Sequence, residues 1–163
     1  MKRRAGYSAA ELMVVVAIMG IIAGTGPVLM INLQNFFINT TARNDIQRDI
    51  RHSIDIIHRM LRQGKLSTIV IDTPAGQGPY SRVQLTLVDE RACAFRQTGK
   101  KLIMTLAGTE TVLSKNLAYI GFTFPRSDDP SIMSVSLTMS KDIQLGKKKV
   151  LELSVQKVRV MNP

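Results

Sequence analysis

A run of 20 uncharged residues, Leu12 to Ile31, restricts the possible folds of this chain more than any other feature. An α-helix of about 20 apolar residues is long enough to cross the ~30 Å hydrocarbon core of a bilayer. Three cations at positions 2–4 precede the run with no acid nearby, and cations collect on the cytoplasmic side of a span. The sequence therefore predicts a single-pass membrane protein whose residues from Asn32 onward lie outside the cytoplasm.

A carboxylate, that of Glu11, stands at the start of this apolar run. A charged side chain in a span costs about 2.5–3.5 kcal/mol on insertion scales, so it is usually paired and functional. A cleaved secretory signal, cut near Ala23, is the competing interpretation. Glu11 argues against that signal because it would interrupt the apolar core, and the run is also longer than the usual core of about 7–15 residues.

The residues on either side of Glu11 form a specific arrangement. A short basic leader ends at Gly6, Tyr7 follows, and the stretch SAAELMVVVAIMGIIAG then places Glu11 fifth after the glycine. This arrangement resembles the class III signal of type IV pilins and type II secretion pseudopilins. The resemblance implies cleavage between Gly6 and Tyr7 by a prepilin peptidase, methylation of the new amino group and retention of the apolar run. Tyr7 departs from the family, in which phenylalanine is commonest at this position.

The resemblance also implies an assembly role for Glu11, whose carboxylate would pair with the Tyr7 amine of a neighbouring subunit. The alternative is that Glu11 lies at the headgroup boundary, neutralised by the amine of its own chain or by water. Further along, Gly24, Gly26 and Pro27 predict a kink or a melted turn, because proline removes a backbone donor and clashes with the preceding turn. In pilin-like filaments such a break lets the stem lengthen, whereas a plain proline kink is the alternative.

Beyond the span, apolar residues at steps of three and four predict the buried face of an amphipathic helix that ends at Gly64. The residues of this face are Ala42, Ile46, Ile50, Ile54, Ile57 and Leu61. We expect the charged residues between them to form a solvated face, with subunit contacts as the alternative. Together with the span they make one helix of about 55 residues, roughly 80 Å long at the usual helical rise.

The remaining hundred residues are rich in β-branched and alternating apolar segments separated by turns, which predicts antiparallel strands. The expected strands cover residues 67–72, 82–88, 92–106 (two strands about a turn at Gly99), 117–124, 132–140 and 148–160. Packing this sheet on the amphipathic helix buries both apolar surfaces. The predicted class is α+β, a long N-terminal helix packed on a C-terminal antiparallel sheet, as in the lollipop shape of pilins. The predicted divisions are a cleaved leader (1–6), a transmembrane stem (7–31), an amphipathic helix (32–64) and a β-rich head (65–163).

The motifs of common enzyme classes are missing from the sequence. It contains no Walker loop, nucleophile elbow, paired metal motif or dinucleotide fingerprint, so we predict no catalytic, cofactor-binding or metal-binding residue. Cys93 is the one cysteine, and we expect it to be a small buried hydrophobic residue. His52 and His58 are six apart on a helix and therefore on opposite faces.

These observations favour a structural protein without enzymatic activity. We expect a minor pilin or J-type minor pseudopilin, a subunit in or at the tip of a type IV pilus or type II secretion filament. Its partners would be other pilin or pseudopilin subunits, the prepilin peptidase and an inner-membrane assembly platform. It would lie in the inner membrane with its head in the periplasm or outside the cell.

Two other functions remain open. The 22 Lys and Arg residues outnumber the 12 Asp and Glu residues, and a surplus of cations attracts phosphate. One alternative is therefore a membrane-anchored DNA-binding module for competence, although the chain has few aromatic residues for base stacking and we do not expect nucleic acid as a partner. The other is an anchored enzyme whose site matches no motif.

Overall fold

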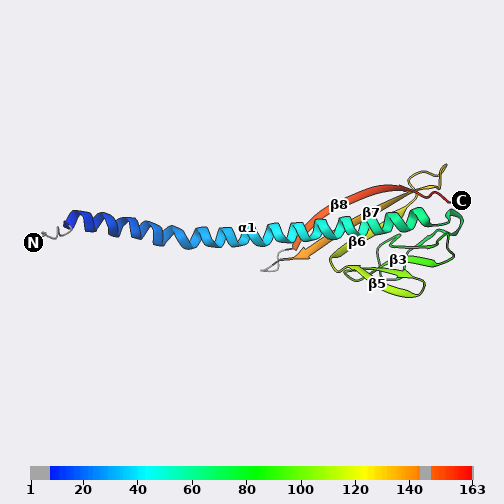
Figure 1. Cartoon of the computed structure of the whole chain (residues 1–163), viewed down its shortest axis with the longest axis horizontal. Coiled ribbons are helices and arrows are strands. Elements are labelled where there is room, and N and C mark those ends of the chain that lie inside the picture. Colours follow the sequence, from blue (N-terminus) through cyan, green and yellow to red (C-terminus); the bar gives the residue numbers. More distant parts are fainter. Residues whose placement is uncertain (1–7, 144–147, 163) are drawn as a thin grey trace, which may run out of the picture. The chain divides into compact units, whose positions relative to one another are not determined.

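A computed structural model of the chain describes residues 8–143 and 148–162. The chain divides into two units, Met1–Thr40 and Thr41–Pro163. The described elements, labelled in Figure 1, are α1 (Ala9–Gln63), the 3₁₀ helix η1 (Leu66–Thr68), β1 (Val70–Asp72), β2 (Arg82–Thr86), β3 (Ala92–Thr98), β4 (Lys101–Leu106), β5 (Thr109–Ser114), β6 (Leu117–Thr123), β7 (Ile132–Asp142) and β8 (Lys148–Arg159). The predicted class is confirmed: the fold is α+β, with one long N-terminal helix and antiparallel strands in a pilin-like layout.

The strands form two sheets where the sequence suggested one. Strands β1 to β5 pair in chain order as a five-stranded antiparallel sheet, and β6 to β8 pair in chain order as a second sheet of three strands. Backbone hydrogen bonds connect the two at the Phe122 N–H, which donates to the Tyr80 carbonyl, and at the Leu117 N–H, which donates to the Lys100 carbonyl, both at 2.9 Å. The chain therefore leaves the first sheet after β5 and begins the second at β6.

The sequence predicted a strand from residue 67, where the chain forms η1 up to Thr68, and it did not predict strand β5. Strand β5 follows β4 through a two-residue loop, Ala107–Gly108, because Leu106 pairs directly with Thr109. Both loop residues have positive φ, 49° for Ala107 and 84° for Gly108, which is the conformation of a type I′ hairpin turn. The first four residues of β5 are exposed, so the strand carries no alternation of buried and exposed positions by which a sequence reveals a strand.

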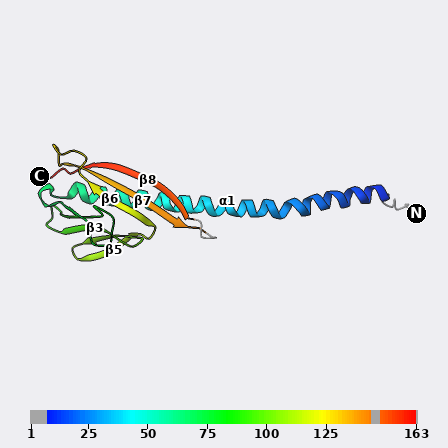
Figure 2. The same ribbon diagram turned by 180° about the vertical axis from the view of Figure 1, so that it is seen from behind.

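The core of the second unit lies between the sheets and one face of α1. The predicted helix face is confirmed, because Ala42, Ile46, Ile50, Ile54, Ile57 and Leu61 are all at most 5% exposed. Val83, Leu85 and Leu87 of the β2 segment are buried as their alternation predicted. In both views β3 and β5 lie below this part of α1, whereas β7 and β8 cross it obliquely (Figure 1, Figure 2). Each large apolar side chain buried here contributes about 1.5–3 kcal/mol.

The C-terminal end of α1 is held by other parts of the second unit. The helix ends at Gln63, so the predicted stop at Gly64 is confirmed. The Val88 N–H donates to the Gln63 carbonyl at 2.9 Å, and the Asn162 side-chain amide donates to the Arg62 carbonyl at 3.0 Å. These bonds satisfy carbonyls that have no partner inside a helix.

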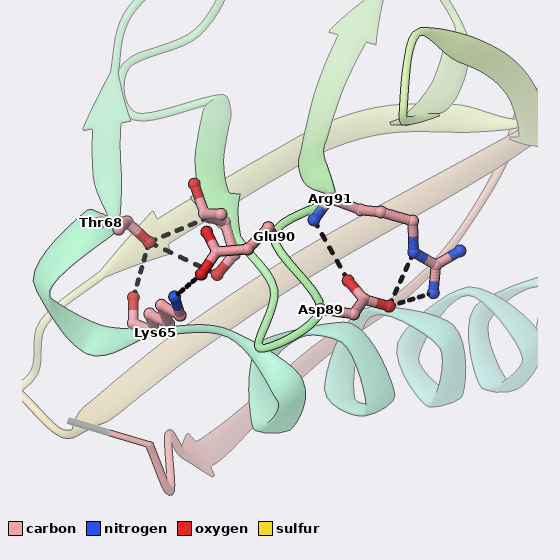
Figure 3. Close-up of polar contacts among 6 residues, drawn as sticks. Lys65, Thr68, Asp89, Glu90 and Arg91 are labelled. Atoms are coloured by element: carbon pink, nitrogen blue, oxygen red, sulfur yellow. Dashed lines mark hydrogen bonds and ion pairs between the residues drawn. The ribbon is translucent and has the colours of Figure 1, made fainter.

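Polar contacts join the segment after α1 to the turn between β2 and β3 (Figure 3). The Lys65 ammonium pairs with the Glu90 carboxylate, and the Thr68 hydroxyl donates to the Lys65 carbonyl at 2.8 Å. Within the turn, Arg91 donates through Nε to the Asp89 carboxylate at 2.7 Å, and this bond lowers the pKa of Asp89. The contacts support the turn where Glu90 has a φ of 65°, a conformation that non-glycine residues seldom adopt.

Two charges on α1 contact the strands, contrary to the solvated face that we expected for them. The Lys141 ammonium donates to the Asp45 carboxylate at 2.6 Å. The Asp49 carboxylate accepts from the Ser114 hydroxyl at 3.2 Å and from the Asn116 amide at 2.9 Å. The prediction was wrong for these two residues, because the helix periodicity alone cannot reveal polar groups at the end of β5, on the β5–β6 connection and on β7.

Candidate membrane and assembly segment

The described part of the first unit exposes a continuous apolar surface. Every residue from Ser8 to Phe37 is exposed, and the large hydrophobic side chains in this stretch are 50–74% exposed. By length and composition, α1 is able to cross a membrane. A soluble monomer seldom exposes so large an apolar surface, so this segment is compatible with membrane anchoring.

Glu11 lies at the third helical position and forms a reciprocal pair with Ser8, the residue that precedes α1. The Ser8 N–H donates to Glu11 Oε2 at 2.9 Å, and the Glu11 N–H donates to Ser8 Oγ at 3.3 Å. This is a capping box, in which two backbone donors at the helix start are satisfied by two side chains. A helix cap of this kind is worth about 1 kcal/mol.

Sequence reasoning missed the role of Ser8, although the signal was present in the printed residues. The pattern S-x-x-E directly before an apolar run is the sequence form of a capping box, and residues 8–11 read SAAE. The cap gives Glu11 a role within its own chain that needs no neighbouring subunit. The carboxylate is still able to accept further hydrogen bonds, because an ionised carboxylate has about four lone-pair sites.

The predicted processing residues, Gly6 and Tyr7, lie outside the described residues. The contact proposed between Glu11 and a Tyr7 amine is therefore a prediction that rests on the sequence.

The residues that were predicted to break the helix are helical in this single chain. Gly24, Gly26 and Pro27 all lie inside α1, so residues 24–27 contain no melted turn. The Thr25 hydroxyl donates to the Ile21 carbonyl at 2.9 Å, a bond that often accompanies bending of helices. A side chain added at Gly24 or Gly26 would meet open space. Whether these residues break the helix in an assembled filament stays a prediction.

Cys93 in the second unit is a poor nucleophile. Its thiol is free, its side chain is 2% exposed, and burial raises its pKa to about 11. A hollow of about 230 Å³ beside it is lined by Thr68, Val70, Gln84, Leu85, Thr86, Ala92, Ala94, Thr105 and Gly108. None of these described residues is a base able to ionise the thiol. The prediction of a buried hydrophobic cysteine is confirmed.

The two histidines lie on α1 with different surroundings. His52 is exposed and His58 is half-buried. Burial lowers the pKa of His58, and the positive charge of Arg62 lowers it further, whereas Asp55 raises it. Among the described residues, no group of three His, Cys, Asp or Glu side chains could hold a metal ion.

In comparisons with known proteins, no family model matches this chain and no curated protein matches it. The fold and the N-terminal segment define a class, an α+β protein whose long first helix is compatible with a membrane anchor. These comparisons assign the chain to no family.

Proposed function

We propose that this chain is a structural subunit, a minor pilin or J-type minor pseudopilin, of a type IV pilus or a type II secretion filament. The observation that supports the proposal is the place of Glu11. It is the only charged residue between Arg4 and Arg43, and it stands in the first turn of a helix whose apolar side chains are all exposed up to Phe37. A lone carboxylate in such a segment requires a cation.

Processing would supply that cation. Cleavage after Gly6 leaves an amino group on Tyr7, and the Tyr7 amine of one subunit pairs with Glu11 of the next as the helices stack. In lipid the pair removes most of the cost of a single buried charge, because opposite charges attract strongly at low dielectric. The pairing also fixes the axial register between neighbouring helices, which apolar packing alone leaves loosely specified.

The remaining parts of the chain have structural roles in this proposal. The apolar residues of α1 hold the subunit in the inner membrane before assembly and pack against other stems afterwards. The second unit lies in the periplasm or outside the cell and presents surfaces to neighbouring subunits. The chain makes and breaks no covalent bond, and the assembly platform supplies the energy for lifting it from the membrane.

The N-terminus of the mature protein gives a direct test. We expect mass spectrometry of the chain, co-expressed with a prepilin peptidase, to find an N-terminus at Tyr7, with or without a methyl group. Expression without the peptidase is the control and should yield the uncleaved leader. A mature N-terminus near Gly24 would instead support a secretory signal and contradict the proposal.

A pair of substitutions separates the charge of Glu11 from its capping role. Glutamine at the third helical position also forms a capping box, so Glu11→Gln keeps the cap and removes the charge. Ser8→Ala removes the hydroxyl that accepts from the Glu11 N–H, and keeps the charge. We expect Glu11→Gln to be processed normally but to enter filaments at least tenfold less than the unsubstituted chain, and Ser8→Ala to be incorporated nearly as well as it.

The measurement is an immunoblot of sheared filaments against membrane fractions from cells that carry the filament machinery. Normal incorporation of Glu11→Gln would show that the charge has no assembly role. A large loss for Ser8→Ala beside normal incorporation of Glu11→Gln would assign the role of Glu11 to the helix cap.

A further inference from the structure

Four arginines line one face of α1 in the second unit. We call Arg48, Arg51, Arg59 and Arg62, with Asp55 at their centre, the arginine stripe. At about 100° per helical residue, the five lie within a sector of roughly 80°. That sector is nearly opposite the buried face that contains Ile50 and Ile57. The stripe is about 21 Å long at the usual helical rise.

Among the described residues, no ion pair involves the stripe. All five of its residues are exposed. Elsewhere in the second unit seven described cations are in ion pairs, as Arg82 is with Asp72 and Arg96 with Glu110. Four arginines outside these ion pairs therefore share one face of α1, with Asp55 on the central turn.

A second copy of the chain is a poor partner for this face. Seven of the described acids are already in ion pairs: Asp45, Asp72, Asp89, Glu90, Glu110, Asp128 and Asp142. Asp49 and Asp129 accept hydrogen bonds from neighbouring side chains. Two stripes facing each other would bring eight guanidinium groups together with two carboxylates, and like charges at close range repel.

We propose that the arginine stripe docks an acidic helix of a different protein chain. The stripe has one charge per helical turn, so it matches a helix that presents the opposite charges at the same spacing. The guanidinium fork binds a carboxylate through two parallel hydrogen bonds. Asp55 adds specificity, because it requires a cation at the centre of the partner. The matching partner reads acid, acid, base, acid, acid at steps of three, four, four and three residues.

Asp55, the central acid of the stripe, also favours a protein over nucleic acid as the binding partner. The phosphates of a duplex carry one sign of charge throughout, so Asp55 would repel them at the middle of the stripe. A helix, in contrast, is able to place a lysine or arginine there. The steps between stripe residues are the same in both directions along α1, so the charge pattern accepts a partner helix running either way.

A hollow at the C-terminal half of the stripe supplies a place for one partner side chain. It has a volume of about 470 Å³ and is lined by Asp55, His58, Arg59, Arg62 and Gln63. The Nε2 atom of His58 is shielded from solvent and has no hydrogen-bond partner. A carboxylate in this hollow would meet Arg59, Arg62 and the imidazole of His58, and it would also lie near the like charge of Asp55.

The inference rests on the proposed function only in assigning the acidic helix to a neighbouring subunit. Its test needs neither leader cleavage nor filaments, so the two proposals fail separately. The probe is a fluorescent alanine-rich helical peptide with glutamates and a central lysine at the matching spacing. An isomeric peptide with the same charges scattered around the helix is its control. Anisotropy with the full chain in uncharged detergent should show at least tenfold tighter binding of the patterned peptide.

Two matched variants of the chain test the location of the site. The stripe variant replaces Arg48, Arg51, Arg59 and Arg62 with glutamine. The control variant replaces four exposed cations that lie in no described ion pair, Lys101, Lys115, Lys157 and Arg159, with glutamine. We expect the stripe variant to bind the patterned peptide at least tenfold more weakly and the control variant to bind within about twofold of the unsubstituted chain.

A charge exchange provides a test that requires only one substitution. Asp55→Lys should weaken binding of the peptide with central lysine, and a peptide with central glutamate should restore it. Equal binding of the two isomeric peptides, or equal losses in both chain variants, would overturn the proposal. Tighter binding of a 20-base-pair duplex that depends on the stripe would identify a nucleic-acid site instead. Dimerisation that the stripe variant abolishes would identify a second copy as the occupant.

Discussion

The cap that Glu11 forms is chemically compatible with the pairing proposed for its carboxylate. Through Oε2 it caps α1 by accepting the Ser8 N–H at 2.9 Å, and this fixes where the carboxylate lies relative to the helix start. A capped and oriented carboxylate loses little further side-chain freedom when a neighbouring amine arrives, which favours pairing. The cap thus prepares the contact that assembly is proposed to use.

Gly64 was predicted as the stop of the helix, but the structure requires glycine there because other atoms pack closely against it. Its φ is outside the left-handed region that the described Gly76, Gly99 and Gly108 adopt. Instead, a Cβ at this position would overlap Cδ1 of the buried Leu85 and lie 3.3 Å from the Leu61 carbonyl. We expect Gly64→Ala to lower the free energy of unfolding by about 1–3 kcal/mol, the usual cost of overpacking.

Urea unfolding of the full chain in detergent measures this cost, with labelling of Cys93 as the probe. Cys93 is the only cysteine and is buried, so it reacts when the second unit unfolds. In a Leu85→Ala background the alanine at residue 64 has room, and its cost should fall by at least half. An unchanged cost in that background would contradict the packing explanation.

For the helices and strands, the repeat of apolar residues along the chain decided what the sequence was able to predict. The buried face of α1 and the alternation of Val83, Leu85 and Leu87 were predictable because burial on one side imposes a period on the residues. Strand β5 and the division into two sheets were not, because β5 is largely exposed and its hairpin places Ala107 at positive φ. Asp49 shows the same limit, since its partners lie more than 60 residues away in the sequence.

Two adjacent residues of α1 provide a matched comparison. Asp49 accepts hydrogen bonds from Ser114 and Asn116, and Ser114 is only 4% exposed. We expect Asp49→Ala to lower the free energy of unfolding by about 1–3 kcal/mol, because it leaves a buried hydroxyl without this acceptor. Arg48→Ala, one residue earlier on the exposed stripe, should change it by less than about 0.5 kcal/mol. The same Cys93 labelling assay measures both, and equal effects would contradict a specific role for Asp49.

At the scale of the whole molecule, the basic balance of the chain determines how it responds to acid. The formal net charge is +10 at pH 7, and every carboxylate that becomes protonated increases it. Hydrogen bonds lower the pKa of several aspartates, chiefly from Lys141 for Asp45, from Arg82 for Asp72, from Arg91 for Asp89, from Arg126 for Asp128 and from Ser131 for Asp129. The second unit is therefore held partly by carboxylates that must stay ionised.

The sign of the effect follows from proton binding. These aspartates have a lower pKa in the folded chain than the usual 3.8, so the unfolded chain binds their protons more readily. Their contribution to stability is complete above that value and is lost as the pH falls through the lowered pKa. His58 adds an earlier and separate decline below its usual pKa of 6.5, because burial disfavours its charged form.

We expect the free energy of unfolding to decline gently below pH 6.5 and steeply below about pH 4. A disulfide reagent that reacts with Cys93 at acid pH measures it across this range. His58→Gln should remove the gentle decline and leave the steep one. Lys141→Gln should be less stable than the unsubstituted chain at pH 7, and the difference should vanish once Asp45 is protonated. A difference that persists unchanged at pH 2 would mean that Lys141 acts through packing of its aliphatic stem and not through the ion pair with α1.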